Sequence, residues 1–230
     1  MEMIEAIKAR HSVRSYTTQE IDSSQVAVLE QAIAESNEQS GLSIQACWND
    51  EQAFSSMIAR FGRFKNVRNY IALLGPEGSE AEEKCGYYGQ KLVLLLQTLG
   101  LNSCWVGASY NKRKAAITIE KGQKLHLVIS FGYGLDQGRP SSIKPLEDFY
   151  KNESGADLPA WFVAAMEAAV LAPTAMNQRK FLMTLKPNEV KAEALRGSYT
   201  VVDLGIVKCN FEIGAAAAGA DVGRDWFWAE

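Results

Sequence analysis

The sequence predicts a mixed α+β fold with two pseudo-symmetric halves, on three observations. Helix-type and strand-type apolar patterns alternate along the chain. Residues 85–100 are apolar almost all the way round, as expected for a long helix buried at the centre. A polar linker at residues 152–159 is followed by a helix, a turn and a strand, the order already seen near residues 22–48. We therefore divide the chain into an N-terminal half (1–151), the linker, and a C-terminal half (160–230), which form one integrated unit.

The elements of the N-terminal half follow from local patterns. Asp22 supplies an N-cap and Gly41 a stop for one helix, and Gly100 ends the central helix. A short apolar run that ends in Gly-Pro predicts a buried strand. The predicted order is helix, helix, strand, helical segment, strand, central helix, extended piece and strand: residues 1–9, 22–41, 42–48, 49–61, 69–75, 85–100, 103–107 and 124–134.

The C-terminal half starts with a helix that Pro173 ends, and a strand follows. A further helix from Gly205 can be laid over the central helix from Gly86, which brings Gly219 into register with Gly100. This overlay indicates an internal repeat, and the alternative is a chance similarity between two apolar helices.

Composition excludes several classes of protein. A chain of 230 residues with 47% hydrophobic residues buries a sizeable core, which argues against disorder. The net charge of −3 provides no basic field for nucleic acid or an anionic membrane, so we expect a small-molecule substrate. Four scattered cysteines and two histidines lack metal-ligand spacing, and we expect buried free thiols and no metal. Without a signal-peptide pattern or an apolar run of roughly 18 residues, a cytoplasmic protein is expected.

A first motif, ARHSVRSY, is rich in anion-binding groups. Arg10, Ser12 and Arg14 alternate on an extended segment, so that their side chains are expected on one face. Two guanidinium groups and a hydroxyl there would converge on a phosphate, and His11 adds a ring donor or a backbone amide. An ordinary cluster of solvated charges is the alternative.

A second motif, APTAMN, follows the helix of the C-terminal half. Pro173 ends the helix, and Thr174 and Asn177 offer a hydroxyl and an amide beside exposed backbone. By itself this motif is also typical of a plain helix C-terminus.

Together the motifs resemble the FMN-dependent nitroreductase superfamily, whose members open with Arg-x-Ser-x-Arg and carry an Ala-Pro-Ser-x-x-Asn turn. Here the patterns read RHSVR and APTAMN, with Thr174 in place of serine. LGLNSCWVG and ISFGYG are similar to the ending of the family's core helix and to its late Ile-Gly-Tyr element. The resemblance implies a mainly antiparallel sheet with helices around a long central helix.

The order of the motifs departs from the family pattern. In the usual member the proline turn follows the second helix, whereas here it comes after the linker. Family members are generally homodimers that hold FMN between subunits. The resemblance therefore implies a fused pseudo-dimer with one working site, as in a compact branch of nitroreductase-like proteins first seen in a thermophile. A monomer is expected, with a homodimer as the alternative.

The resemblance also implies which residues bind FMN. The predicted contacts are Arg10, His11, Ser12 and Arg14 on the phosphate; Pro173, Thr174, Ala175 and Asn177 on the ribityl or ring side; Lys65 near the pyrimidine; Trp105, Val106 and Gly107 along the ring; and Lys144 as a second phosphate partner. For Lys65, a surface lysine beside Arg63 is the alternative.

The implied function is an FMN-dependent oxidoreductase. NAD(P)H would reduce the flavin, and a nitroaromatic, quinone or similar electron-poor acceptor would then be reduced in a ping-pong cycle. Because the flavin carries this chemistry, no catalytic side chain is expected. Two alternatives remain: a flavin carrier or sensor covered by the aromatic tail at Trp226, Phe227 and Trp228, and a phospho-ligand-binding protein without redox chemistry. The tail is otherwise expected to form a satellite core cluster.

Overall fold

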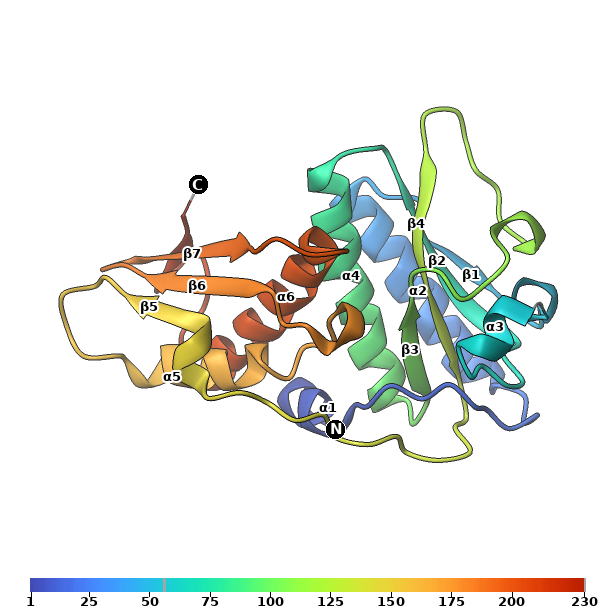
Figure 1. Cartoon of the computed structure of the whole chain (residues 1–230), viewed down its shortest axis with the longest axis horizontal. Helices are drawn as coiled ribbons and strands as arrows, with labels where there is room; N and C mark the ends of the chain where they lie inside the picture. Colours follow the sequence, from blue (N-terminus) through green and yellow to red (C-terminus); the bar gives the residue numbers. More distant parts are fainter. Residues whose placement is uncertain (56, 230) are drawn as a thin grey trace.

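The computed structural model, which describes residues 1–55 and 57–229, confirms the α+β fold. Two four-stranded sheets lie on either side of a central layer that contains the long helices α4 and α6 (Figure 1). The helices are α1 (Met3–Ala9), α2 (Ser23–Ser40), α3 (Met57–Phe61), α4 (Ser79–Thr98), α5 (Ala160–Ala169) and α6 (Thr200–Ala217). The strands are β1 (Gln45–Cys47), β2 (Asn69–Gly75), β3 (Asn102–Val106), β4 (Lys124–Gly132), β5 (Tyr150–Asn152), β6 (Phe181–Leu185), β7 (Glu189–Ala194) and β8 (Phe227–Trp228).

The first sheet has the order β1-β2-β4-β3, and all its pairs are antiparallel. Strand β2 is buried on both faces, which explains its unbroken apolar run. Ile71 and Leu73 belong to the main core, whereas Tyr70, Ala72 and Leu74 belong to a second core on the other face. The predicted strand 69–75 is confirmed with both of its limits.

The second sheet has the order β5-β6-β7-β8. Its central pair, β6 and β7, is antiparallel, and the two short edge strands are parallel to their neighbours. Strand β5 comes from the end of the predicted N-terminal half, yet it pairs with β6 through Tyr150 and Met183. The second sheet therefore begins before residue 151, the predicted end of the N-terminal half. The division of the chain into two halves at the linker stays a prediction.

Helices α4 and α6 pack closely at two glycines (Figure 1). A Cβ on Gly86 would overlap the carbonyl oxygen of Val202, and a Cβ on Gly205 would overlap that of Glu83. The contact is reciprocal, because each glycine meets the residue three positions before the other glycine. Gly86 and Gly205 therefore occupy equivalent positions in the helix contact, and the sequence overlay also aligns these two glycines.

The ends of the two helices share the same register. After α4 the Leu101 amide donates to the Leu96 carbonyl at 2.9 Å, and after α6 the Ala220 amide donates to the Ala215 carbonyl at 3.0 Å. In both cases the preceding glycine, Gly100 or Gly219, adopts positive φ. The two helix ends therefore have the same local fold.

Several predicted limits were wrong. Helix α4 begins at Ser79 and not at residue 85, because the acidic segment before it supplies Glu80 and Glu82 to the first turn, where the helix dipole favours them. Helix α6 begins at Thr200 and not at Gly205. The predicted helical segment 49–61 is a 3₁₀ turn (Gln52–Phe54) followed by α3, and its residue 56 lies outside the described residues, as does residue 230 of the predicted C-terminal half.

The aromatic tail forms a core cluster away from both long helices' shared face. The Trp226 side chain is buried and stacks on Trp161, with ring centroids 5.5 Å apart. Its ring also meets Phe211 edge-on at 5.3 Å. Trp226 therefore belongs to the main core, with Trp228 packed against that core and Phe227 exposed, and the expectation of a separate satellite cluster was wrong.

The next two observations hold for the residues that the structure describes. The model has no helix there with the length and apolarity that crossing a membrane requires. The four cysteines, Cys47, Cys85, Cys104 and Cys209, are buried and free, as predicted.

Candidate functional site

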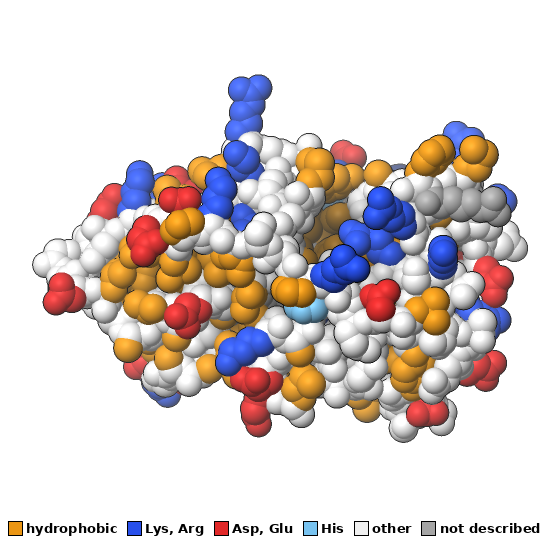
Figure 2. Space-filling model, turned by 60° about the horizontal axis from the view of Figure 1, so that its bottom comes forward, with side chains coloured by type: hydrophobic (Ala, Val, Ile, Leu, Met, Phe, Trp, Pro, Cys, Tyr) orange, Lys and Arg blue, Asp and Glu red, His pale blue; other side chains and the backbone are white. Residues whose placement is uncertain are grey.

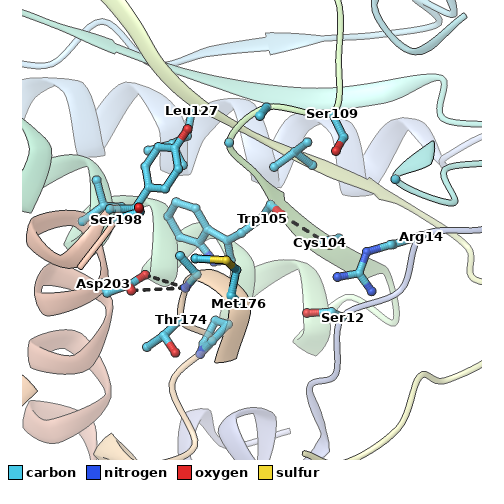
Figure 3. A pocket seen from close by; sticks show the side chains of 18 of the residues that line it. Ser12, Arg14, Cys104, Trp105, Ser109, Leu127, Thr174, Met176, Ser198 and Asp203 are labelled. Carbon is cyan, nitrogen blue, oxygen red and sulfur yellow. Dashed lines mark hydrogen bonds between the residues drawn. The ribbon is translucent and has the colours of Figure 1, made fainter. Parts of the chain in front are cut away.

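A cavity of about 680 Å³ lies between the two halves of the molecule. This volume falls in the range of roughly 300–1,000 Å³ that is typical of cofactor and small-molecule sites. Figure 2 shows a hollow near the middle of the molecule, with hydrophobic side chains inside it and basic side chains along one rim. In Figure 3, Ser12 and Arg14 lie on one side of Trp105, and Thr174, Met176 and Asp203 lie on the other.

The wall from the first half includes Ser12 and Arg14, as predicted. The Val13 amide donates to the Ser103 carbonyl at 3.0 Å, and the Lys65 amide donates to the Arg14 carbonyl at 2.9 Å. These bonds fix an extended segment whose Val13 side chain is buried in the core. Because side chains alternate along such a segment, Ser12 and Arg14 are left on the side of the cavity.

Arg10 and His11 do not line the cavity. Arg10 is the C-cap of α1, so the alternation that aligns Ser12 with Arg14 does not extend back to it. Its side chain is buried near Cys104, and burial lowers the pKa of Arg10 to about 10. The Cβ of His11 instead packs beside Gly138.

The end of β3 contributes Trp105, Val106 and Gly107 to the wall, as predicted. The Trp105 ring packs against Gly89, where a Cβ would come within 2.5 Å of it. Its Nε1 is buried and has no hydrogen-bond partner among the residues that the structure describes.

The wall from the second half includes the turn at Pro173, Thr174 and Ala175, which were among the predicted contacts. The Ala175 amide donates to both carboxylate oxygens of Asp203, at 2.9 and 3.1 Å, and Gln178 Nε2 donates to Oδ2 at 3.1 Å. Burial raises the pKa of Asp203 to about 6, although these hydrogen bonds oppose the shift. The carboxylate therefore holds the turn against α6.

Three further predicted contacts, besides Arg10 and His11, fall outside the cavity lining. Asn177 is exposed, and the preceding Met176, with φ of 51°, lines the cavity in its place. The backbone of Lys65 pairs with the Arg14–Tyr16 segment and its side chain is exposed, whereas Arg63 lines the cavity. Lys144 is exposed in the segment that leads to β5.

Sequence reasoning missed several lining residues. Asp203 was detectable as a single acid within the apolar run TVVDLG, a position where a carboxylate needs a partner. Tyr199 and Phe61 carried no such signal. The remaining missed residues are Gly62, Arg63, Cys104, Ala108, Ser109, Leu127, Met176, Ser198, Val202 and Ile206.

Known structures share this fold. A "putative nitroreductase" from Thermotoga maritima is 21% identical, with a TM-score of 0.67 over 96% of this chain and 87% of that one. A "putative nitroreductase" from Desulfovibrio desulfuricans, solved in complex with FMN, is 19% identical, with a TM-score of 0.51 over 64% and 93%. The nitroreductase NfrA1 from B. subtilis is 14% identical, with a TM-score of 0.51 over 64% and 73%.

No curated protein matches the chain. A family model does match it, over residues 2–215, and this range includes every cavity residue named above. The chain accordingly belongs to the family described as "Putative TM nitroreductase", and is a nitroreductase-like oxidoreductase.

Proposed function

We propose that this protein is an FMN-dependent oxidoreductase that uses NAD(P)H to reduce a nitroaromatic, quinone or similar electron-poor acceptor. The observation that carries the proposal is the shared cavity, in which Arg14 from the first half faces the Thr174 turn from the second half across Trp105 (Figure 3). FMN, when bound, supplies hydride acceptance and donation at its isoalloxazine ring.

The chemistry of the cavity walls fits FMN. Arg14 and Ser12 supply a cation and a hydroxyl for a phosphate ester. Leu127, Val202 and Ile206 supply an apolar surface for a flat ring.

The protein's own residues would orient the cofactor and leave one side of it accessible. Arg14 and Ser12 would hold its phosphate end, and the Asp203-bound turn would fix the opposite wall. The aromatic tail does not line the cavity, so it provides no cover of the kind that a carrier or sensor would need. This favours turnover over the carrier alternative.

We further propose that the chain is an internal pseudo-dimer, sufficient as a monomer, with one FMN. The reciprocal contact of Gly86 and Gly205 supports a pseudo-twofold relation between α4 and α6. When Gly205 is placed over Gly86, five residues that line the first cavity fall on residues that line a second cavity of about 440 Å³. In order, Ser198, Tyr199, Val202, Asp203 and Ile206 fall on Ser79, Glu80, Glu83, Lys84 and Tyr87.

The second cavity is poorly suited to FMN. Glu212 accepts hydrogen bonds from the Tyr87 hydroxyl and, at 2.7 Å, from Trp228 Nε1. Lys208 pairs with Glu83 at 2.5 Å and lies over the Trp228 ring. The polar side chains of the second cavity therefore already bind one another. The carboxylates among them would repel a phosphate.

The visible spectrum of the purified protein tests the proposal. We expect a yellow protein with one FMN per chain that NADH or NADPH bleaches rapidly. A yellow protein that stays oxidised would support the carrier, and a colourless one that does not take up added FMN would support the phospho-ligand alternative.

A substitution tests the placement of the phosphate. Arg14→Ala should weaken FMN binding by about 1.5–3 kcal/mol, the range for a hydrogen bond to a charged group. Lys65→Ala is the matched control, because its exposed side chain lies outside the cavity lining. Equal dissociation constants for the two variants would argue against the assignment of Arg14.

A further inference from the structure

Large apolar side chains are exposed at the cavity. Phe61 is 81% exposed and Met176 is 82% exposed, and Tyr199 is 44% exposed. All three line the cavity, Phe61 from the first half and the other two from the second. Apolar side chains that remain exposed in a concave site are typical of a surface that a ligand covers.

Two of these residues, together with Arg63, share an unusual backbone conformation. Arg63, Met176 and Tyr199 have φ of 62°, 51° and 60°, in the left-handed region that bulky residues rarely adopt. Such conformations persist only where the surrounding structure holds them, and they cluster at binding sites. We call Phe61, Arg63, Met176 and Tyr199 the mouth cluster.

Neighbouring hydrogen bonds hold the mouth cluster in place. The Tyr199 carbonyl accepts the first bond of α6 from the Asp203 amide at 2.9 Å. Gln178 Nε2 donates to the Ser198 carbonyl at 2.6 Å as well as to Asp203, which ties the Met176 turn to the start of α6. The Tyr199 ring covers Gly107, where a Cβ would come within 2.8 Å of it. Met176 and Tyr199 are therefore positioned before any ligand arrives.

The charge at the mouth is positive. Arg63 and Arg14 both line the cavity and are both exposed, and Arg14 is the residue proposed above to pair with a phosphate. Among the described lining residues Asp203 is the one acid, and its carboxylate is occupied by the Ala175 and Gln178 donors. Arg63 is thus left to attract an anionic group on a second ligand.

We propose that the mouth cluster is the acceptor site, and that it selects flat aromatic acceptors that carry a carboxylate over neutral ones of the same shape. This inference rests on the proposed function. For a nitroaromatic acceptor, the donor NAD(P)H gives a hydride and one proton is taken up from solution. These two electrons and two hydrogens convert the nitro group to a nitroso group with the release of one water molecule, and NAD(P)⁺ is the other product.

The test measures the reoxidation of reduced flavin by the acceptor separately from its reduction by NAD(P)H. The FMN-loaded protein is reduced anaerobically with one equivalent of dithionite and mixed with 4-nitrobenzoate or with 4-nitrobenzamide, which has the same shape and no charge. The rate of flavin reoxidation is followed by absorbance, and the ratio of the two rates is compared between variants. In that comparison the intrinsic reactivities of the two acceptors cancel.

Arg63→Gln should lower the carboxylate-to-amide ratio by about two- to fivefold, as expected for an exposed ion pair. Lys121→Gln, which removes the same charge from an exposed turn before β4, should leave the ratio unchanged. Phe61→Ala should slow both acceptors by roughly two- to tenfold through the loss of an aromatic contact. Phe227→Ala, an exposed phenylalanine in β8, is its control.

Reoxidation by dioxygen, which is small and neutral, should be the same in all variants. An unchanged carboxylate-to-amide ratio in Arg63→Gln, or unchanged reoxidation rates in Phe61→Ala, would overturn the mouth cluster as the acceptor site. If the same variants still bind FMN and are still reoxidised by dioxygen, the proposed function stands. A protein that cannot be loaded with FMN would overturn both.

Discussion

Replacing Asp203 by asparagine tests how the turn at Ala175 is held against α6 at the cavity. The side chain is 4% exposed, and its carboxylate accepts hydrogen bonds from the Ala175 amide and the Gln178 side chain. An asparagine has nearly the same shape, but it is neutral and keeps one acceptor oxygen. The Asp203→Asn variant therefore separates the effect of the charge from that of the packing.

The size and sign of the effect follow from the pKa of Asp203. Burial raises this pKa from the ordinary 3.8 to about 6. A difference of about two pH units corresponds to about 3 kcal/mol, at 1.36 kcal/mol per unit. Because the folded state binds the proton more tightly, the stabilisation from this group is complete below about pH 4 and is lost as the pH rises through 6.

The variant lacks this pH dependence. At pH 4, where the wild-type carboxyl is itself neutral, the variant should be less stable by about 1–2 kcal/mol, because the asparagine amide nitrogen cannot accept a hydrogen bond where the second carboxyl oxygen does. Between pH 4 and pH 7 it should gain up to about 3 kcal/mol relative to the wild type.

Urea unfolding followed by circular dichroism at several pH values measures both curves. Asp157→Asn is the matched control, because that aspartate is exposed in the linker. A difference between wild type and Asp203→Asn that stays constant from pH 4 to pH 7 would refute the reasoning. A relative loss of stability by the variant towards pH 7 would show that hydrogen bonding outweighs burial at this carboxylate.

Three further predictions concern the core. Gly86→Ala and Gly205→Ala should each lower the unfolding free energy by about 3 kcal/mol, because the new methyl group overlaps a carbonyl oxygen, and a variant that melts like the wild type would contradict the close helix contact. Trp226→Ala should cost about 3–5 kcal/mol and leave the absorbance spectrum of bound flavin unchanged; a shifted spectrum would mean that the tail reaches the cofactor. Asn210→Ala removes the acceptor for Gln90 Nε2 at 2.9 Å, and thermal unfolding should show a loss of about 1–3 kcal/mol, which an unaltered midpoint would disprove.

Much of the fold was predictable because its elements have strong periodic patterns. Strand β2 is buried on both faces, so its apolar run begins and ends with the strand. Helix starts were less predictable, since the first turn of α4 is acidic and exposed and does not show the apolar pattern of the turns after it. Strand β7 has the sequence EVKAEA, in which mixed charges leave little strand signal, and its position depends on pairing with β6.

The site was predictable where local backbone sets the direction of a side chain. Ser12 and Arg14 follow from alternation along one extended segment. That Arg63 lines the cavity and Lys65 does not was not predictable. This placement depends on the left-handed conformation of Arg63 and on the backbone pairing of Lys65 with a distant segment. Asp203 stands out as a single acid in an apolar run, but its partner, the Ala175 amide 28 residues away, was not predictable from the sequence.

The reciprocal packing of α4 against α6 has a consequence for how the cavity responds to dilution. Where two separate subunits build a composite pocket, lowering their concentration takes the pocket apart. Here both walls are joined by one polypeptide, so their local concentration is set by the chain and does not fall when the solution is diluted. At nanomolar protein, occupancy should then depend on the amount of free cofactor alone.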